Sequence, residues 1–506
     1  PWGPIIGRGI RIVERELEER YKVLMVSPEV APFAKVGGLA DVCGSLPKAL
    51  TMLGNDVRVV MPRYRGIEEV RTITDFPVDI GGRRETAILR EGVIRAQLHG
   101  QERFVPVYFL DNYHYFDREG IYGFWDEAER YAFFCRAVLE MFPKFNWWPD
   151  IIHCNDWATG PIPLLLKEQY GHRALYSRMA TVFTIHNLQY QGNFPREVLG
   201  LLHLGDGYYH PDGLEFYGQV SYMKAGLLYA DMISTVSRTY ANEIQQASQG
   251  HGMDGVLRMR AVDLMGIVNG LNYHEFNPQT DPRLVRNYGP GDLAGKRENK
   301  YALQKELSLP PSDGPLLGMV ARLVDQKGLD LVADSMDELL SQDVQFVLLG
   351  SGDRHYEDLF REIQRAHPHQ AAVVIGFNIG LAQRIYAASD LFLMPSRFEP
   401  CGLGQLISLR YGTIPVVRAT GGLADTISDY DSKRGSGNGF SFTDYSPKAL
   451  QEAVGRALDL YRDVEQWRRL VENAMAEDHS WNRSGAEYMG LYQMAINKKR
   501  QVLISA

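Results

Sequence analysis

The chain of 506 residues is long enough for more than one domain with a sizeable buried core. Its formal net charge of −8 and the absence of a dense Lys/Arg tract argue against a nucleic-acid-binding protein. The sequence contains no apolar run of about 18 residues, the length that a membrane-spanning helix requires. Its four cysteines are widely spaced and form no C-x-x-C pair, so we expect neither a disulfide framework nor a zinc site.

The first 20 residues lack an initiator Met and carry charges through the middle of the segment. A secretory signal peptide would have an apolar centre instead. The sequence leaves open whether a targeting segment has been removed. We expect a cytoplasmic location, which suits the cysteine pattern, or the plastid stroma if a transit peptide has been cleaved.

Short apolar and β-branched runs alternate with amphipathic stretches along most of the chain. In the first half the strand-like runs are 21–27, 56–62, 104–110, 150–154, 180–186 and 232–237. In the second half they are 316–323, 344–350, 372–377, 391–396 and 413–419. The stretches between them, such as 329–342 and 356–367, repeat apolar residues at helical spacing. Apolar strands that alternate with helices predict two doubly wound α/β domains with parallel sheets.

The segment 270–315 is rich in Asn, Pro, Asp and Gly, a composition that is typical of a linker. From Ser446 to about Arg500 the pattern predicts successive helices with no strand between them. The sequence GGLAD occurs twice, at 37–41 and at 421–425, each time between a strand-like and a helix-like run. Either the repeat is chance, or each domain presents a glycine-rich turn at the carboxyl edge of its sheet, where ligands bind in such folds.

Cations and glycines at strand exits are candidates for binding phosphate, because helix N-termini favour anions. Arg322 and Lys327 in ARLVDQKG are spaced so that they could flank a diphosphate. Lys35 precedes Gly37 and Gly38 in a similar position. In both places the alternative is an ordinary solvated turn.

The segment MPSRFEPCGLGQL places Glu399 after a strand and Gly402 and Gly404 before a helix. A carboxylate beside such a helix start suits a ligand that has hydroxyls near a phosphate, such as a nucleotide sugar. Cys401 in the same segment has no His nearby, so we interpret it as structural. The segment LLGSGD has only part of a dinucleotide fingerprint, which favours a close turn over a dehydrogenase site.

In the first half, HCNDW and TIHN place His153, Asp156 and His186 at predicted strand ends. Hydrogen-bonded residues at a loop edge are the better interpretation, and we expect no metal there. The aromatic groups at 145–148 and 216–223 are expected to lie mostly in the core, although exposed members could stack on sugar rings.

Several of these segments occur together, in the same order, in one enzyme family. The blocks are KVGGLADV, HCNDW, TIHNLQYQG, YMKAGLLYADMISTVS, VNGLN, ARLVDQKGLD and SRFEPCGLGQLISLRYGTIPVVRATGGLADT. From about Tyr21 to Tyr488 the chain resembles the bacterial glycogen synthases and plant starch synthases, which are retaining glucosyltransferases of the ADP-glucose type. The resemblance implies the GT-B fold, with two Rossmann-like domains that face a cleft and a C-terminal helix that crosses back to the first domain.

The resemblance also implies domain bounds and residue roles. The bounds are an extension at 1–20, an acceptor-side domain at 21–270, a hinge and linker at 271–315, a donor domain at 316–480 and a crossover helix at 481–506. The implied catalytic residues are Glu399, His186, Lys327, Arg322 and Asp156. The implied donor-binding residues are Lys35, Gly38, Arg322, Lys327, Asn269, Phe377, Glu399, Gly402, Leu403 and Gly404.

The implied reaction transfers glucose from ADP-glucose to the non-reducing end of an α-1,4-glucan such as glycogen, starch or a maltooligosaccharide. It needs no metal and no other cofactor, and no nucleic acid or membrane takes part. Ile407 stands where some retaining relatives have a second glutamate, and Gly404 stands where some have a larger or polar residue. Without a convincing second carboxylate, a front-face route is favoured over a covalent intermediate.

Three other functions remain as alternatives. A sucrose or trehalose-phosphate synthase would share the fold and the cations but not the paired KVGGL and EPCGL segments. A non-catalytic glucan-binding homologue would be expected to lose Glu399 or Lys327, and both are present. An NAD dehydrogenase would need a complete dinucleotide fingerprint, which the chain lacks. The sequence does not decide which glucan is made, or the oligomeric state.

Overall fold

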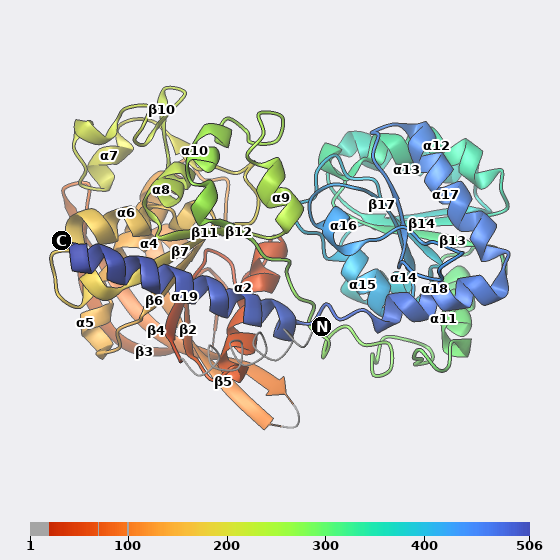
Figure 1. Cartoon of the computed structure of the whole chain (residues 1–506), viewed down its shortest axis with the longest axis horizontal. Coiled ribbons are helices and arrows are strands. Elements are labelled where there is room, and N and C mark those ends of the chain that lie inside the picture. The colour runs from red at the N-terminus through yellow and green to blue at the C-terminus, as the bar shows by residue number, and fades with distance from the viewer. Residues whose placement is uncertain (1–19, 69, 99–100, 506) are drawn as a thin grey trace, which may run out of the picture. The chain divides into compact units, whose positions relative to one another are not determined.

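The structure is a computed structural model that describes residues 20–68, 70–98 and 101–505. The predicted extension at 1–20 therefore lies outside the described residues, apart from Arg20. The chain forms two compact units (Figure 1). One consists of the chain up to Val236, Ala241–Gly270 and the segment from Trp481 onward, and the other of Ser237–Tyr240 and Leu271–Ser480.

The first unit is built on a mixed sheet whose order among the described strands is β12-β11-β7-β6-β1-β2-β5-β4-β3. These strands are β1 (Lys22–Val26), β2 (Asp56–Pro62), β3 (Arg71–Ile80), β4 (Arg83–Leu98), β5 (Gln101–Asp111), β6 (Ile151–Asn155), β7 (Ala180–Ile185), β11 (Met232–Thr235) and β12 (Leu264–Gly266). Strand β4 runs antiparallel to both of its neighbours, and the other pairings are parallel. The strands β1, β6 and β7 are almost wholly buried because helices cover both faces, which explains their continuous apolar sequence.

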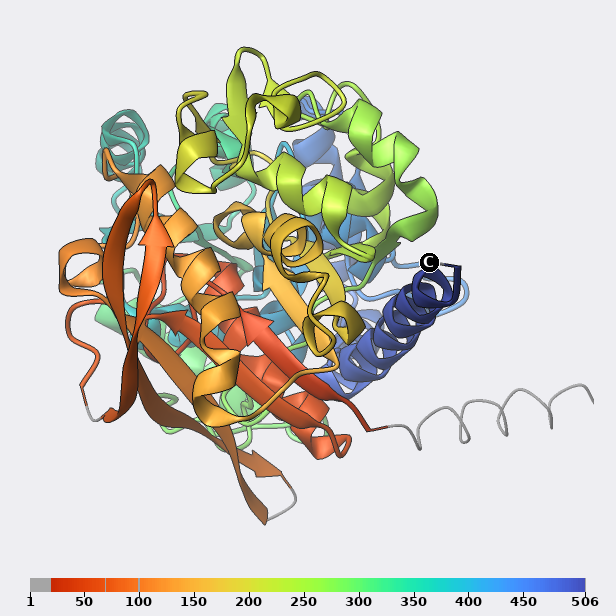
Figure 2. The same cartoon turned by 90° about the vertical axis from the view of Figure 1, so that its left-hand side faces the viewer.

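Strands β3 and β4 were missed by the sequence analysis. They extend the sheet as a long antiparallel hairpin (Figure 2). Their polar and apolar residues alternate, since one face is exposed, and such a pattern is weaker than a continuous apolar run. A small sheet of β8 (Asn193–Phe194), β10 (Gln219–Ser221) and β9 (Glu215–Phe216) was also missed, because strands of two or three residues give no recognisable sequence pattern.

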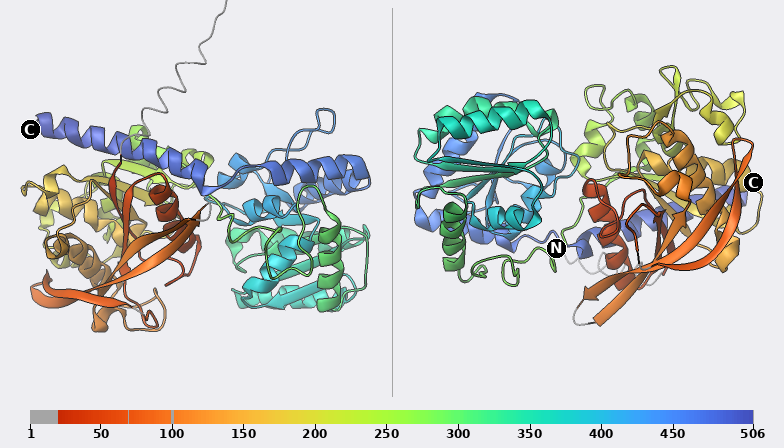
Figure 3. Two further views of the ribbon diagram at one scale, coloured as in Figure 1. Left: turned by 90° about the horizontal axis from the view of Figure 1, so that it is seen from below. Right: turned by 180° about the vertical axis from the view of Figure 1, so that it is seen from behind.

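The main helices of the first unit are α2 (Gly38–Met52), α4 (Glu127–Glu140), α8 (Tyr222–Tyr229) and α19 (Trp481–Ser505). Shorter helices along this part of the chain are α3 (Tyr113–Phe116), α5 (Phe142–Phe145), α6 (Pro161–Leu165), α7 (Val198–Leu201), α9 (Arg238–Glu243) and α10 (Asp254–Met259). Helix α19 packs on α2, β6, β7 and β11, so the end of the chain returns to the first unit (Figure 3). Tyr492 on α19 fixes this packing through a 2.9 Å hydrogen bond between its hydroxyl and Nδ1 of His153.

The second unit has a fully parallel sheet in the order β15-β14-β13-β16-β17-β18. Its strands are β13 (Leu316–Val320), β14 (Gln345–Gly350), β15 (Ala371–Ile375), β16 (Leu391–Met394), β17 (Ile414–Arg418) and β18 (Phe440–Phe442). Its helices are α11 (Ala294–Glu306), α12 (Leu329–Leu340), α13 (Arg354–Ala366), α14 (Ile379–Ala388), α15 (Gly404–Arg410), α16 (Gly421–Thr426), α17 (Pro447–Tyr461) and α18 (Val464–Ala476). Numbered from β13, this order is 3-2-1-4-5-6, the order of a dinucleotide-binding Rossmann fold.

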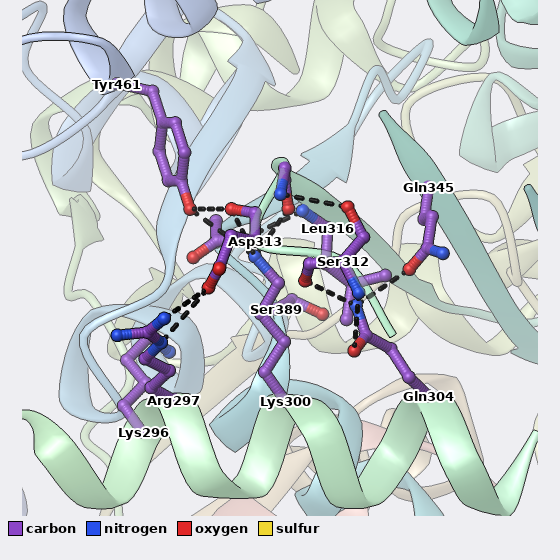
Figure 4. A network of polar contacts seen from close by, with 12 residues as sticks. Lys296, Arg297, Lys300, Gln304, Ser312, Asp313, Leu316, Gln345, Ser389 and Tyr461 are labelled. Atoms are coloured by element: carbon purple, nitrogen blue, oxygen red, sulfur yellow. Dashed lines mark hydrogen bonds and ion pairs between the residues drawn. The ribbon is translucent and has the colours of Figure 1, made fainter. Parts of the chain in front are cut away.

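Helix α11 lies within the range 271–315 that was expected to be hinge and linker, and a buried polar network joins it to the second sheet (Figure 4). Lys300 Nζ lies 2.7 Å from Asp390 Oδ2, and the same oxygen accepts a hydrogen bond from the backbone N–H of Leu316. Lys296 donates to two backbone carbonyls and to Thr413 Oγ1, and burial lowers its pKa to about 7. These contacts fix α11 to the amino ends of β13 and β16.

None of the helices in the described part of the chain is both long and apolar enough to cross a membrane.

Candidate active site

In each unit the connections from the central strand leave in opposite directions, and this creates a switch point at the carboxyl edge of the sheet. In the second unit the switch point lies between β13 and β16. In the first unit it lies between β1 and β6. Ligands of open α/β sheets bind at these places. The predicted site residues of each unit follow strands of its sheet, so they gather at this edge in two groups, one in each unit.

In the second unit, Lys327 and Glu399 meet across the switch point. Lys327 ends the short 3₁₀ turn 325–327 after β13, and Glu399 lies in the loop after β16. Lys327 Nζ lies 2.6 Å from Glu399 Oε2, which also accepts a 3.1 Å hydrogen bond from Ser396 Oγ. Glu399 is only 6% exposed, so a paired and hydrogen-bonded charge is held there in one orientation.

Glycines allow the backbone of this region to pack closely. Gly328 has φ +69°, and a Cβ there would lie 2.1 Å from the carbonyl oxygen of Pro395. The second GGLAD segment packs directly on the loop that carries Glu399. A Cβ on Gly421 would lie 1.9 Å from Glu399 O, and one on Gly422 would lie 2.1 Å from Cys401 O. The Gly422 N–H donates to Glu399 O, so this repeat sets the position of the carboxylate loop.

The other predicted residues of the second unit surround this pair at the same edge of the sheet. Arg322 follows β13 and is exposed, and its guanidinium has no ion pair within the described residues. Phe377 follows β15 and is 82% exposed, which leaves its ring open to a planar ligand. Gly402, Leu403 and Gly404 form the turn into α15, and Gly402 has φ +77°.

In the first unit, Glu29 organises the loop that carries Lys35. Its Oε2 accepts hydrogen bonds from the backbone N–H groups of Val36 (2.5 Å) and Gly37 (3.1 Å), and its Oε1 accepts one from Tyr122. Glu29 is buried, and the sequence analysis did not select it. The sequence feature that could have identified Glu29 is its position, just after a buried strand and before a glycine-rich loop, where free backbone N–H groups need acceptors.

Lys35 makes a surface ion pair with Asp41 of the first GGLAD segment, with Nζ and Oδ1 2.6 Å apart. The side chains are 48% and 33% exposed. A Cβ on Gly37 or Gly38 would meet no atom within 4 Å. The two GGLAD copies thus share their place at a helix start, but only the second needs its glycines for internal packing.

Asp156 follows β6 with φ 57° and ψ 177°, a backbone conformation that is rare for any residue except glycine. Its Oδ1 accepts a 2.7 Å hydrogen bond from the backbone N–H of His186, and the N–H of Asn187 is a further donor. Burial raises its pKa to about 7 in spite of these donors. Backbone strain at a buried carboxylate is typical of functional sites.

His186, which follows β7, is held as a neutral imidazole. Its Nε2 lies 2.9 Å from Asn155 Oδ1, and Asn155 Nδ2 donates to the carbonyls of Val26 and His153. Because these carbonyls fix the amide orientation, Oδ1 is an acceptor and Nε2 carries the proton, which leaves Nδ1 as an acceptor. Burial lowers the pKa of His186 to about 3, so the ring is neutral at pH 7.

Asn269 is 6% exposed, and its Oδ1 has no hydrogen-bond partner within the described residues. An orphaned buried acceptor of this kind is typical of a group that binds a ligand hydroxyl. His153, in contrast, lies inside β6 and not at a strand end, with both ring nitrogens used in the interior by Tyr492 and Thr184. Its role is structural. Within the described residues, no group of three or more His, Cys, Asp or Glu could hold a metal ion.

Comparison with known families gives two matches that together span most of the chain. The family model described as the starch synthase catalytic domain matches residues 22–259, and that of the group 1 glycosyl transferases matches residues 302–476. Glycogen synthase from Desulforudis audaxviator is 61% identical over 484 residues, which are 94% of this chain and 97% of that protein. Glycogen synthase from Moorella thermoacetica is 56% identical over 488 residues, or 96% of this chain and 99% of that one.

Solved structures agree with these matches. The catalytic domain of starch synthase IV from Arabidopsis thaliana, bound to ADP and acarbose, superposes with a TM-score of 0.87 at 35% identity and covers 95% of this chain and 100% of its own. Sucrose-phosphate synthase from Thermosynechococcus elongatus, at 17% identity and a TM-score of 0.58 over 96% of this chain and all of its own, shares the fold. The predicted GT-B fold with two Rossmann-like domains is confirmed. The chain belongs to the glycogen and starch synthase family and is a glycosyltransferase.

Proposed function

We propose that the enzyme transfers glucose from ADP-glucose to the non-reducing end of an α-1,4-glucan with retention at the anomeric carbon. Family membership supports a nucleotide-sugar donor and a glucan acceptor. The choice of ADP-glucose is the finer part of the proposal, supported by the likeness to a starch synthase that binds ADP. The observation that carries the proposal is the Lys327–Glu399 pair at the switch point of the second sheet.

In the second unit, the cations stabilise the leaving diphosphate. Breaking the bond between glucose and ADP concentrates negative charge on the phosphate oxygens, and fixed cations stabilise such charge most when it develops. Arg322 offers a planar set of N–H donors that suits phosphate. Lys327 has three N–H bonds, and one of them is directed to Glu399. Glu399 in turn accepts hydrogen bonds from the donor glucose, while Phe377 gives the adenine a stacking face.

In the first unit, neutral acceptors bind sugar hydroxyls. His186 presents Nδ1, and its neutral state at pH 7 follows from its lowered pKa. Asn269 Oδ1 accepts a second hydroxyl. Asp156 holds the backbone of His186 in place and so positions the ring. Lys35, with the Gly38 backbone beside it, adds a cation for the donor phosphate.

The retaining route proceeds on the front face of the glucose. A double-displacement mechanism needs a carboxylate nucleophile close to a second carboxyl group. Glu399 is paired with Lys327, and Ile407 stands at the position of the alternative glutamate. We therefore propose that the departing phosphate accepts the proton of the attacking hydroxyl. No metal takes part, and the enzyme works in the cytoplasm.

The experiment is to incubate the protein with ADP-glucose and maltoheptaose in EDTA, and to analyse the products. The proposal predicts stoichiometric ADP release and new α-1,4 linkages at non-reducing ends. The rate in EDTA is compared with the rate in its absence. A rate more than about tenfold lower in EDTA, restored by Mg²⁺ or Mn²⁺, would reject the metal-independent route. New β-linkages would reject retention.

A further inference from the structure

A pocket of about 510 Å³ opens in the first unit, away from the candidate active-site residues. Its polar lining comes from Arg20 and Asp150, which precede β1 and β6, from Arg178, which precedes β7, and from Lys499 and Arg500 on α19. The strands β1, β6 and β7 are parallel neighbours, so these residues gather at the amino edge of the sheet. A volume in the range of small-molecule sites makes the pocket large enough for an organic phosphate.

The four cations of the pocket have no ion-pair partner among the residues that the structure describes. The neighbouring Lys498, by contrast, is paired with Asp263. Asp150 is the one acidic residue among the described residues of the lining, and its Oδ2 already accepts a 2.8 Å hydrogen bond from the backbone N–H of Lys22. Among the described residues, the pocket therefore has an excess of positive charge that contacts within the protein do not neutralise.

The dipole of helix α19 does not explain why these four cations lie together. Arg20 and Arg178 come from other elements, and Lys499 and Arg500 precede the last turn of a helix that ends at Ser505. Three of the four cations are arginines, whose planar N–H groups bind phosphate oxygens in pairs. Beside them the side chains of Ile496 and Leu503 give the pocket an apolar wall.

The pocket and the candidate active-site residues of the first unit lie at opposite ends of the same strands. Asp150 precedes β6 and Asp156 follows it, and the five residues of β6 span about 16 Å at the usual rise of a strand. A ligand in the pocket would therefore occupy a place that the proposed glucosyl transfer does not use.

We propose that this pocket is a binding site for a small phosphate-rich anion, such as an oligophosphate or an organic phosphate. The arginines bind the phosphate oxygens, and the apolar wall contacts the rest of the ligand. The proposal is independent of the transfer reaction, because the described lining residues do not belong to the candidate active site.

The test is a calorimetric titration of the full chain with inorganic tripolyphosphate at low salt. The pocket variant is Arg178→Gln combined with Lys499→Gln. The matched control is Arg354→Gln combined with Lys448→Gln, which removes the same charges at positions that are 93% and 84% exposed. Any binding of the probe to the proposed donor residues is common to all three proteins and cancels in the comparison.

We expect the pocket variant to bind the probe at least about tenfold more weakly than the control, as loss of hydrogen bonds to a charged group implies. We also expect the wild-type affinity to fall as salt is raised. All replaced side chains are partly or fully exposed, so thermal unfolding should be unchanged. Identical isotherms for the pocket variant and the control would overturn the proposal.

A second variant tests whether the chain fills the pocket itself. The segment before Arg20 contains Glu14, Glu16, Glu18 and Glu19, and the variant replaces all four with Gln. If the wild type binds no probe while this variant does, acidic residues of the chain are the occupant and the proposal is overturned. Equal binding by both proteins supports a site for an external anion.

Discussion

Lys327 Nζ and Glu399 Oε2 lie 2.6 Å apart, although 72 residues separate them in the sequence. They follow β13 and β16, which are neighbours at the switch point of the second sheet. The pair places a cation and a carboxylate together where such a fold binds its ligand. One group is suited to the diphosphate of a nucleotide sugar and the other to its hydroxyls.

Replacement of Glu399 by Gln should lower kcat strongly and leave the affinity for ADP nearly unchanged. In the proposed reaction the carboxylate binds the donor glucose and not ADP, and the loss expected is about 2–4 kcal/mol in activation free energy, the scale of one preorganised polar contact. Steady-state kinetics and ADP binding measure the two effects. Glu362→Gln, at an exposed position of α13, is the control. Near-normal turnover of the Glu399 variant would reject the assignment.

The second GGLAD segment should influence catalysis through the position of Glu399. In Gly422→Ala the new Cβ would collide with the backbone of Cys401, so the carboxylate loop must shift. We expect a lower kcat together with a lower melting temperature. Gly455→Ala on α17, where a Cβ meets no atom within 4 Å, should leave kcat unchanged and should raise the melting temperature slightly, because alanine favours a helix interior over glycine. A Gly422→Ala enzyme with wild-type kcat would show that the loop tolerates the displacement.

Lys35 and Asp41 allow a sharp test of the role of the first glycine-rich loop. If Lys35 contacts the donor, Lys35→Gln should reduce kcat/KM for ADP-glucose by about 10–150-fold, the range for a hydrogen bond to a charged group. Asp41→Asn breaks the same ion pair but keeps the cation, so its effect should be small, as for exposed pairs in general. Equal, small effects of the two changes would mean that Lys35 only serves the ion pair.

The pH dependence of stability should reveal the buried Asp156. Its pKa is raised to about 7 in the folded protein, so the folded state favours the protonated form. The resulting stabilisation is complete below the ordinary pKa of 3.8 and is lost as the pH rises toward 7. Asp156→Asn keeps an oxygen acceptor for the His186 N–H and cannot ionise. Its melting temperature relative to wild type should therefore increase between pH 4 and pH 7, and a constant difference would contradict the buried-acid interpretation.

His186 has the opposite dependence on pH. Its pKa is lowered to about 3, so its contribution to stability is present above the ordinary pKa of 6.5 and is lost as the pH falls toward 3. The comparison of Asp156→Asn with wild type removes this effect, because both proteins retain His186.

The fold class could be predicted from the sequence because most strands of the two large sheets are buried on both faces. Continuous apolar runs predicted β1, β6, β7 and the first five strands of the second sheet to within a few residues. The three-residue strands β12 and β18 are too short to give a pattern, and the β3–β4 hairpin alternates because one face is exposed. The partial fingerprint at Gly350 and Gly352 is a close turn as predicted, since a Cβ at either would collide with the backbone of Ala321 or Leu323.

The candidate site could be predicted as a set of residue types at strand exits, but not as a set of contacts. Local sequence patterns do not reveal the order of strands in a sheet. The Lys327–Glu399 contact could therefore not be predicted, because it depends on β13 and β16 being neighbours. Glu29 was missed because its partners are backbone N–H groups that depend on the loop conformation. The rare backbone conformation of Asp156 and the hydrogen bond that its side chain accepts from His186 N–H depend on the loop structure, which no sequence pattern reports.

The most direct test of the account is the ratio of kcat/KM for ADP-glucose to kcat/KM for UDP-glucose, with glycogen as the acceptor and nucleotide release as the readout. The proposed function predicts release of ADP that depends on glycogen, and a clear preference for ADP-glucose. Equal values for the two donors would contradict the proposed donor. Absence of glycogen-dependent nucleotide release from either donor would contradict glucosyl transfer to a glucan.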